Sequence, residues 1–339
     1  MRVVSSAPGK LVLLGEYAVL EGAPAVVMAV NRRAHVTLIE QASGSYAVDA
    51  RSLGIRDARG RLAGGRLEWE SVEPGDAAKL QLAGAVIAAS APEGVGFRAS
   101  LDTDEFFHET GRVKLGLGSS AALTVALSGA LHALRGSEPP AVDRLIAMHR
   151  TMQGGRGSGV DIAASRTGGT LVYRIADDVP HVEDLEWPAT LHVGCVWSGK
   201  SASTGDFLRR IGEWREGAPA QYAKAMDELK SCASAGAMAA QCGDADTTVE
   251  AAAAYAECLA EFGRASGANI ISAEHVKIGE VAAQSGLVYK TCGAGGGDIG
   301  IALTTDPDRL SDFRARIEQT AFQWLDLTAD ARGLVAGSS

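Results

Sequence analysis

Three glycine-rich segments of the sequence have the composition of phosphate-binding loops. The first, Lys114-Leu-Gly-Leu-Gly-Ser-Ser-Ala-Ala122, runs directly into a helical pattern at 119–135. A Gly-x-Gly turn at a helix start turns free backbone N–H groups and the positive end of the helix dipole toward one spot, which attracts phosphate oxygens. A hydroxyl at the same place, from Ser119 or Ser120, is also positioned to reach Mg²⁺. The alternative is an ordinary glycine turn with a serine N-cap.

The second segment, Lys290-Thr-Cys-Gly-Ala-Gly-Gly-Gly-Asp298, has four glycines within five positions. It contains the spacing Gly-x-Gly-x-x-Gly at 295–300, but a dinucleotide site needs a helix after that motif. The residues that follow, Ile299-Gly-Ile-Ala-Leu303, are typical of a short strand. A dinucleotide site is therefore excluded. A close approach of backbone to a ligand and a plain hairpin turn both stay open.

The third segment, Gly194-Cys-Val-Trp-Ser-Gly-Lys-Ser201, matches the Walker A pattern letter for letter. Val196 and Trp197 are bulky strand formers where a phosphate-wrapping loop needs compliance, and no apolar run ending in Asp follows to hold Mg²⁺. We therefore interpret the segment as a strand that leads into a helix. The polar residues near that helix start can still bind an anion: Lys200, Ser201, Ser203 and Thr204.

Two isolated polar residues are further candidates for a catalytic role. Lys10 follows Pro8-Gly9 between strand-like runs, and Asp161 lies among small and apolar residues in Gly157-Ser-Gly-Val-Asp-Ile-Ala-Ala-Ser165. A lone lysine is usually solvated, and such an aspartate is more often a cap or a turn former than a catalyst. Each signal taken alone is weak.

The elements that must position these residues alternate between strand and helix patterns. Short apolar runs typical of strands occupy 3–7, 11–14, 25–30, 35–39, 97–101, 168–173, 191–197, 287–290 and 299–303. Helical patterns occupy 77–91, 119–135, 139–152, 201–213, 217–241, 246–266, 271–285 and 307–319. We interpret the polar stretch 44–65 as an exposed hairpin or loop, and place a domain boundary between about 165 and 190.

Composition narrows the class of protein. At 339 residues the chain is long for one core, so we expect two packed domains. A net charge of −9 argues against a nucleic-acid or anionic-membrane surface, since both need a basic face. The five cysteines show neither a pairing pattern nor zinc-ligand spacing. We see no signal peptide and no apolar run of membrane-spanning length, and expect a cytoplasmic protein.

Taken together, the segments resemble the GHMP superfamily, which comprises galactokinase, homoserine kinase, mevalonate kinase and phosphomevalonate kinase. Its three motifs appear as Ala7-Pro-Gly-Lys-Leu-Val-Leu-Leu-Gly-Glu-Tyr-Ala-Val-Leu-Glu-Gly22, as Lys114 to Ala122 and as Thr291 to Asp298. They lie near the start, at one third and near the end, so the resemblance spans nearly the whole chain.

Within the superfamily, two segments look like the phosphomevalonate kinase branch. One is Trp197-Ser-Gly-Lys-Ser-Ala-Ser-Thr204, and the other is Gly157 to Ser165 followed by the strand-like run 168–173. Tyr17 stands where mevalonate kinases usually carry histidine. Mevalonate kinase stays open as an alternative, as do a non-catalytic ligand sensor and a decarboxylase that acts on the diphosphate.

The resemblance implies an α+β, two-domain GHMP kinase fold with the site in the cleft between the domains. Residues 1–175 would form a ribosomal S5-like, ATP-binding N-terminal domain, and residues 176–339 a ferredoxin-like C-terminal GHMP kinase domain. The implied reaction is ATP-dependent and Mg²⁺-dependent phosphorylation of phosphomevalonate to diphosphomevalonate in the mevalonate route to isoprenoids. We expect no nucleic-acid or membrane partner, and a homodimer stays open.

The resemblance also assigns roles to residues. Lys10 and Asp161 would flank the transferred phosphoryl group as catalytic residues, and Ser120 would contact the metal. The ATP phosphates would be held by Lys114, Leu115, Gly116, Leu117, Gly118, Ser119, Ser120 and Ala121. The acceptor side would comprise Glu16, Tyr17, Arg156, Ser158, Lys200, Ser201, Ser203, Gly293, Ala294, Gly295 and Gly296.

Overall fold

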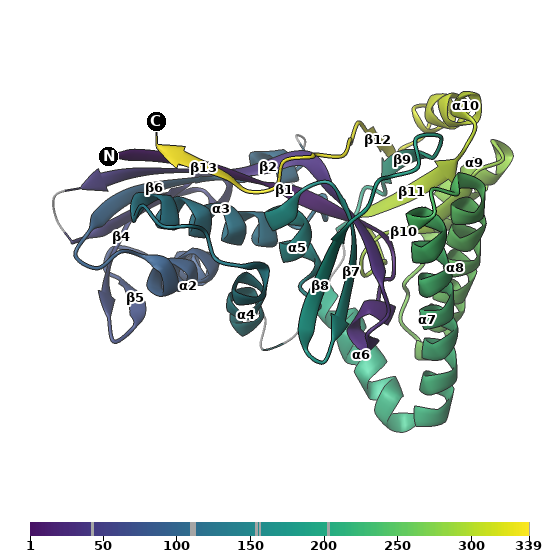
Figure 1. The fold of residues 1–339 in the computed structure, drawn as a ribbon, viewed down its shortest axis with the longest axis horizontal. Coiled ribbons are helices and arrows are strands. Elements are labelled where there is room, and N and C mark those ends of the chain that lie inside the picture. The colour runs from purple at the N-terminus through teal and green to yellow at the C-terminus, as the bar shows by residue number, and fades with distance from the viewer. Residues whose placement is uncertain (42–43, 109–112, 153–154, 156, 202–203, 339) are drawn as a thin grey trace.

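The computed structural model describes residues 1–41, 44–108, 113–152, 155, 157–201 and 204–338. In this part of the chain the strands form two sheets, one of nine strands and one of four. Helices cover one face of each sheet, and the small sheet lies next to one end of the large sheet in an elongated molecule (Figure 1).

The large sheet has the order β13-β1-β2-β6-β3-β4-β5, and β7 pairs with both β2 and β8. Its strands are β1 (Arg2–Leu14), β2 (Ala25–Gln41), β3 (Tyr46–Ala50), β4 (Ile55–Ala63), β5 (Arg66–Trp69), β6 (Gly96–Asp102), β7 (Thr170–Ala176), β8 (Val179–Asp184) and β13 (Val335–Ser338). All pairs are antiparallel except β3 with β6.

The structure corrects two of our expectations for this sheet. The four strand-like runs in the first 40 residues form only two long strands, because register shifts in β1 at Pro8/Gly9 and Val12/Leu14 absorb the breaks without ending the strand. The stretch 44–65 is a hairpin, one of the two forms expected, but it is not simply exposed. Its strands β3 and β4 pair antiparallel, and Val48 and Ile55 are buried in the core.

The helices on the side of the large sheet are α1 (Pro74–Lys79), α2 (Gln81–Ser90), α3 (Ser119–Leu134), α4 (Val142–Met152) and α5 (Val160–Thr167). Short 3₁₀ turns occupy Ala18–Glu21, Arg51–Leu53 and Asp104–Phe106. Helix α3 is central: it contacts β1 and β2 on one side and α2 and α5 on others. Its alanines Ala121, Ala122, Ala126 and Ala130 are fully buried, since small side chains let the helix lie close to the sheet.

The small sheet is antiparallel in the order β10-β11-β9-β12, with β9 (His192–Trp197), β10 (Val288–Thr291), β11 (Ile299–Thr304) and β12 (Gln323–Leu325). Its helices are α6 (Thr204–Gly217), α7 (Pro219–Gln241), α8 (Ala245–Ser266), α9 (Ala273–Gln284) and α10 (Pro307–Ile317). Helices α8, α9 and α10 contact the sheet, and α7 packs along α8 (Figure 1).

The chain returns to the large sheet at its C-terminal end. Strand β13 pairs with β1, and both chain ends lie side by side (Figure 1). Arg33 fixes this return: one of its Nη atoms lies 2.5 Å from the Asp330 carboxylate, and the other donates to the Gly333 carbonyl at 2.7 Å. The large sheet thus takes β8 and β13 from beyond residue 175, and the division at 175/176 stays a prediction.

None of the helices in the described ranges has both the length and the apolar character needed to cross a bilayer.

Candidate active site

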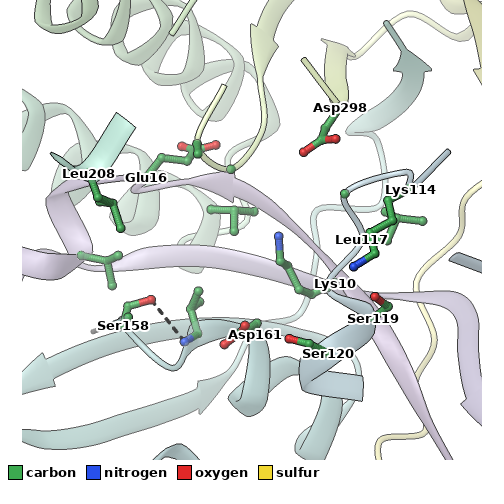
Figure 2. A pocket seen from close by; sticks show the side chains of 18 of the residues that line it. Lys10, Glu16, Lys114, Leu117, Ser119, Ser120, Ser158, Asp161, Leu208 and Asp298 are labelled. Carbon is green, nitrogen blue, oxygen red and sulfur yellow. Dashed lines mark hydrogen bonds between the residues drawn. The ribbon is translucent and has the colours of Figure 1, made fainter. Parts of the chain in front are cut away.

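A cavity of about 600 Å³ opens between the two sheets (Figure 2). Its wall is formed by strand β1, by the N-terminal ends of α3, α5 and α6, and by the loop between β10 and β11. The lining residues are Lys10, Val12, Glu16, Tyr17, Val19, Leu20, Phe106, Lys114, Gly116, Leu117, Gly118, Ser119, Ser120, Gly157, Ser158, Val160, Asp161, Ser201, Gly205, Leu208, Gly293, Ala294 and Asp298.

The glycines at the mouth of α3 are required by both conformation and space. Gly116 and Gly118 have φ values of 81° and 79°, in the left-handed region that favours glycine. A Cβ on Gly116 would lie 2.5 Å from Cγ of Asp298. Gly118 is the N-cap residue, so no cap side chain covers the first N–H groups of α3. These groups are therefore available to an anion in the cavity.

Lys10, from β1, and Asp161, from α5, both lie beside the N-terminal end of α3. A Cβ on Gly118 would lie 3.4 Å from Cε of Lys10 and 3.9 Å from Cβ of Asp161. The Lys10 backbone N–H donates to the Leu117 carbonyl at 2.9 Å, which ties β1 to the glycine loop. Asp161 lies in the first turn of α5, and both side chains point into the cavity beside Ser120 (Figure 2).

A buried histidine connects two of these residues, and sequence reasoning missed it. Nε2 of His149 lies 3.0 Å from Oγ of Ser120, and its Nδ1 lies 4.0 Å from Oδ2 of Asp161. His149 is 2% exposed, on the same face of α4 as the buried Leu145 and Ile146. The spacing i, i+1, i+4 in that helix was the available signal, but it indicates a core position equally well.

Two further contacts join the first motif to the third motif and to Lys290 just before it. Lys290 Nζ lies 2.5 Å from Oε1 of Glu16, and both side chains are almost fully buried. The Tyr17 hydroxyl donates to the Ala294 carbonyl at 2.6 Å. Burial, and then the charge of Glu16, raises the pKa of Tyr17 above its ordinary range, so this hydroxyl stays protonated and can keep donating. The two contacts fix the loop after β1 against β10 and the loop that follows it.

The structure brings most of the predicted site residues to the cavity but not all. Leu115 and Ala121 are buried beside it, in the core. Gly295 and Gly296 pack against Ile270 and Phe207, where an added Cβ would lie 2.3 Å and 2.2 Å away. Their glycine identity is explained by this packing. Predicted residues Arg156 and Ser203 lie outside the described residues.

Lys200 is also not among the lining residues. Its side chain is 64% exposed, and Nζ lies 2.5 Å from Oε1 of Glu274. This hydrogen bond lowers the pKa of Glu274 to about 2. The adjacent segment is a strand rather than a phosphate loop, as expected: Gly194 and Trp197 belong to β9 and pair with β11.

The cavity offers oxygen donors that fit Mg²⁺. No group of three or more His, Cys, Asp or Glu side chains gathers in a metal-binding arrangement within the described ranges. Mg²⁺ in kinases is usually held by one or two protein oxygens together with substrate phosphates, so a full protein cage is not needed. The Ser120 hydroxyl and the Asp161 carboxylate line one wall and provide such a pair.

Comparisons with known proteins agree with this arrangement. Residues 83–169 match the family described as GHMP kinases N terminal domain. Phosphomevalonate kinase of Streptomyces sp. (strain CL190) is 32% identical over 379 aligned positions, which cover 98% of this chain and 98% of that protein. A mevalonate kinase of Thermococcus gammatolerans is 30% identical over 226 positions, which cover 65% of this chain and 64% of that protein.

The fold is shared with solved structures. Streptococcus pneumoniae phosphomevalonate kinase in complex with phosphomevalonate and AMPPNP superposes with a TM-score of 0.75 at 18% identity, over 96% of this chain and 99% of that one. The predicted α+β fold is thereby confirmed. The chain belongs to the GHMP kinase family. Within it, the expected resemblance to phosphomevalonate kinase is confirmed by a match that spans nearly the full length of both proteins.

Proposed function

We propose that the chain transfers the γ-phosphoryl group of ATP to the phosphate of phosphomevalonate and releases ADP and diphosphomevalonate. The observation that carries the proposal is a single cavity lined by the glycine loop at the N-terminal end of α3, by Lys10 and by Asp161. The full-length similarity to a phosphomevalonate kinase supports the choice of acceptor.

Phosphoryl transfer depends mainly on alignment of the reacting groups and on neutralisation of spread negative charge. In the proposed site the free N–H groups of α3 and the Lys114 side chain hold the ATP phosphates. Lys10, which lies beside Gly118, stabilises charge on the transferred group. A bound Mg²⁺ would supply further neutralising charge, and Ser120 and Asp161 are the residues that would hold it.

The role of Asp161 follows from the acceptor. A hydroxyl acceptor has a pKa far above neutral and gains from a nearby base. A phosphate monoester has its second pKa at about 6, so it is already mostly dianionic at neutral pH. With phosphomevalonate as acceptor, Asp161 therefore orients Lys10 and the metal more than it removes a proton.

The acceptor phosphate brings a second polyanion into the cavity, and that charge also needs neutralising. The acceptor side of the wall comprises Glu16, Tyr17, Ser158, Ser201, Gly293 and Ala294. The cations in the described part of the wall are Lys10 and Lys114. We propose that these two lysines, rather than Lys200, provide the positive charge that neutralises the phosphates of both ATP and the acceptor.

A coupled ADP-release assay on mevalonate and phosphomevalonate, run side by side at equal enzyme concentration, tests the proposal. We expect turnover that depends on phosphomevalonate and a much lower rate with mevalonate. Faster turnover of mevalonate would instead favour mevalonate kinase. Tight binding of either compound without ADP release would point to a ligand sensor, and both results contradict the proposal.

A further inference from the structure

His149 lies behind the cavity wall, between the Ser120 hydroxyl and the Asp161 carboxylate, and contacts both groups. We infer that His149 is a positioning residue that accepts the Ser120 hydroxyl proton, so that the lone pairs of this oxygen face the cavity. The inference deepens the proposed function, because it concerns how the same site presents an oxygen ligand to the metal of a bound nucleotide.

The direction of the Ser120–His149 hydrogen bond decides what Ser120 offers to a cation. A serine hydroxyl has one proton and two lone pairs. At 3.0 Å from Oγ, Nε2 of His149 either accepts that proton or donates its own. If Nε2 accepts, the proton points away from the cavity and the lone pairs stay free. If Nε2 donates, it occupies one lone pair, and the oxygen then offers the cavity one lone pair and the serine proton instead of two lone pairs.

The neighbouring carboxylate selects between these two tautomers. A neutral imidazole has one N–H, on either Nδ1 or Nε2. Oδ2 of Asp161 lies 4.0 Å from Nδ1, and its negative charge favours the proton on that nitrogen. Nε2 is then the acceptor. With 2% exposure, His149 has almost no contact with solvent that would compete for either nitrogen.

Packing between α4 and α5 keeps His149 between Ser120 and Asp161. Ile146, one turn before His149 on α4, fills the space beside Gly159, where an added Cβ would lie 2.7 Å from its Cδ1. Gly159 is the N-cap residue of α5, the helix that carries Asp161 in its first turn. The contact therefore fixes α4 against the mouth of α5, and His149 is held at a constant distance from the carboxylate.

The tautomer can be observed directly in the metal-free protein. In ¹⁵N-labelled protein, the two ring nitrogens of a neutral histidine have distinct chemical shifts according to which one is protonated. We expect the Nδ1–H form for His149, with its resonances assigned by their loss in His149→Phe. The Nε2–H form would overturn the inference.

Nucleotide binding gives a second measurement that does not require turnover. The quantity is the ratio of ATP dissociation constants without and with Mg²⁺, measured by calorimetry. His149→Phe keeps a ring but has no acceptor, and we expect the ratio to fall about 3- to 10-fold, the value of roughly one hydrogen bond, while metal-free binding is unchanged. His149→Gln, which places an amide oxygen near the Nε2 position, should restore most of the ratio.

Ser120→Ala supplies the matched comparison. It should lower the ratio as His149→Phe does, and the double variant should lose little more, because both changes remove one shared interaction. Equal losses in His149→Gln and His149→Phe would assign His149 to packing alone and overturn the inference. Neither the tautomer nor the Mg²⁺ effect involves phosphomevalonate, so a wrong acceptor in the proposed function would leave both results intact.

Discussion

Replacing Gly118 by alanine should add the strain of a left-handed residue and also displace Lys10, the lysine that we propose as catalytic. At φ 79° an alanine costs about 1–2 kcal/mol of stability. Its Cβ would also lie 3.3 Å from Cγ of Lys10, about 0.5 Å inside a comfortable carbon–carbon contact. A misplacement of about 1 Å costs roughly 10²-fold in rate. Half of that displacement predicts a kcat roughly tenfold lower.

Gly267 provides the matched control. It ends α8 with a φ of 65°, and an added Cβ there would have no heavy atom within 4 Å. We expect Gly267→Ala and Gly118→Ala to lower the free energy of urea unfolding by similar amounts, and only Gly118→Ala to lower kcat in the ADP-release assay. If folded Gly118→Ala retained kcat within about twofold of the parent, the proposed positioning of Lys10 by this glycine would be refuted.

Three further changes test other parts of the structure. Lys290→Met should destabilise the fold by about 3–5 kcal/mol in urea unfolding, because Glu16 is left buried without its partner, and Glu16→Gln in the same chain should recover part of the loss. Lys200→Ala should raise the pKa of Glu274 from about 2 toward 4.5 in an NMR titration and leave both substrate KM values unchanged. Because that folded-state pKa is depressed, the pair's contribution to stability is present above about pH 4.5 and is lost as the pH falls toward 2. Asp161→Asn should slow turnover of phosphomevalonate by less than the ~10²-fold minimum typical of a lost general base, and a larger loss with a missing acidic limb in the pH profile would contradict the orienting role.

The local parts of the site could be predicted from the sequence. The glycine loop at 114–118 is followed directly by α3, and residues 290–298 are followed by a strand, because turn and helix-start signals depend on neighbouring residues. The formal Walker match was rightly rejected, since bulky residues at Val196 and Trp197 favour a strand. Helix α5 was missed because its glycine-rich start looks like a turn.

The parts that the sequence could not supply depend on contacts between distant residues. Glu16 and Lys290 are 274 positions apart, and neither has a local pattern that distinguishes a buried pair from two solvated charges. His149 sits in an ordinary amphipathic helix, and only the packing of α4 shows that it meets Ser120. The ion pair of Lys200 was equally invisible, since Lys200 precedes α6 and its partner Glu274 lies on α9.

The pairing of β13 with β1 has a consequence for synthesis on the ribosome. Roughly 320 residues separate these two strands, and at about 5–20 residues per second they take about 16–64 s to emerge. Throughout that interval the outer edge of β1 has no partner strand, and an unpaired edge is a template for association with other chains. The nascent protein is therefore most exposed to misassembly before its last strand arrives, long after the glycine loop and α3 have been made.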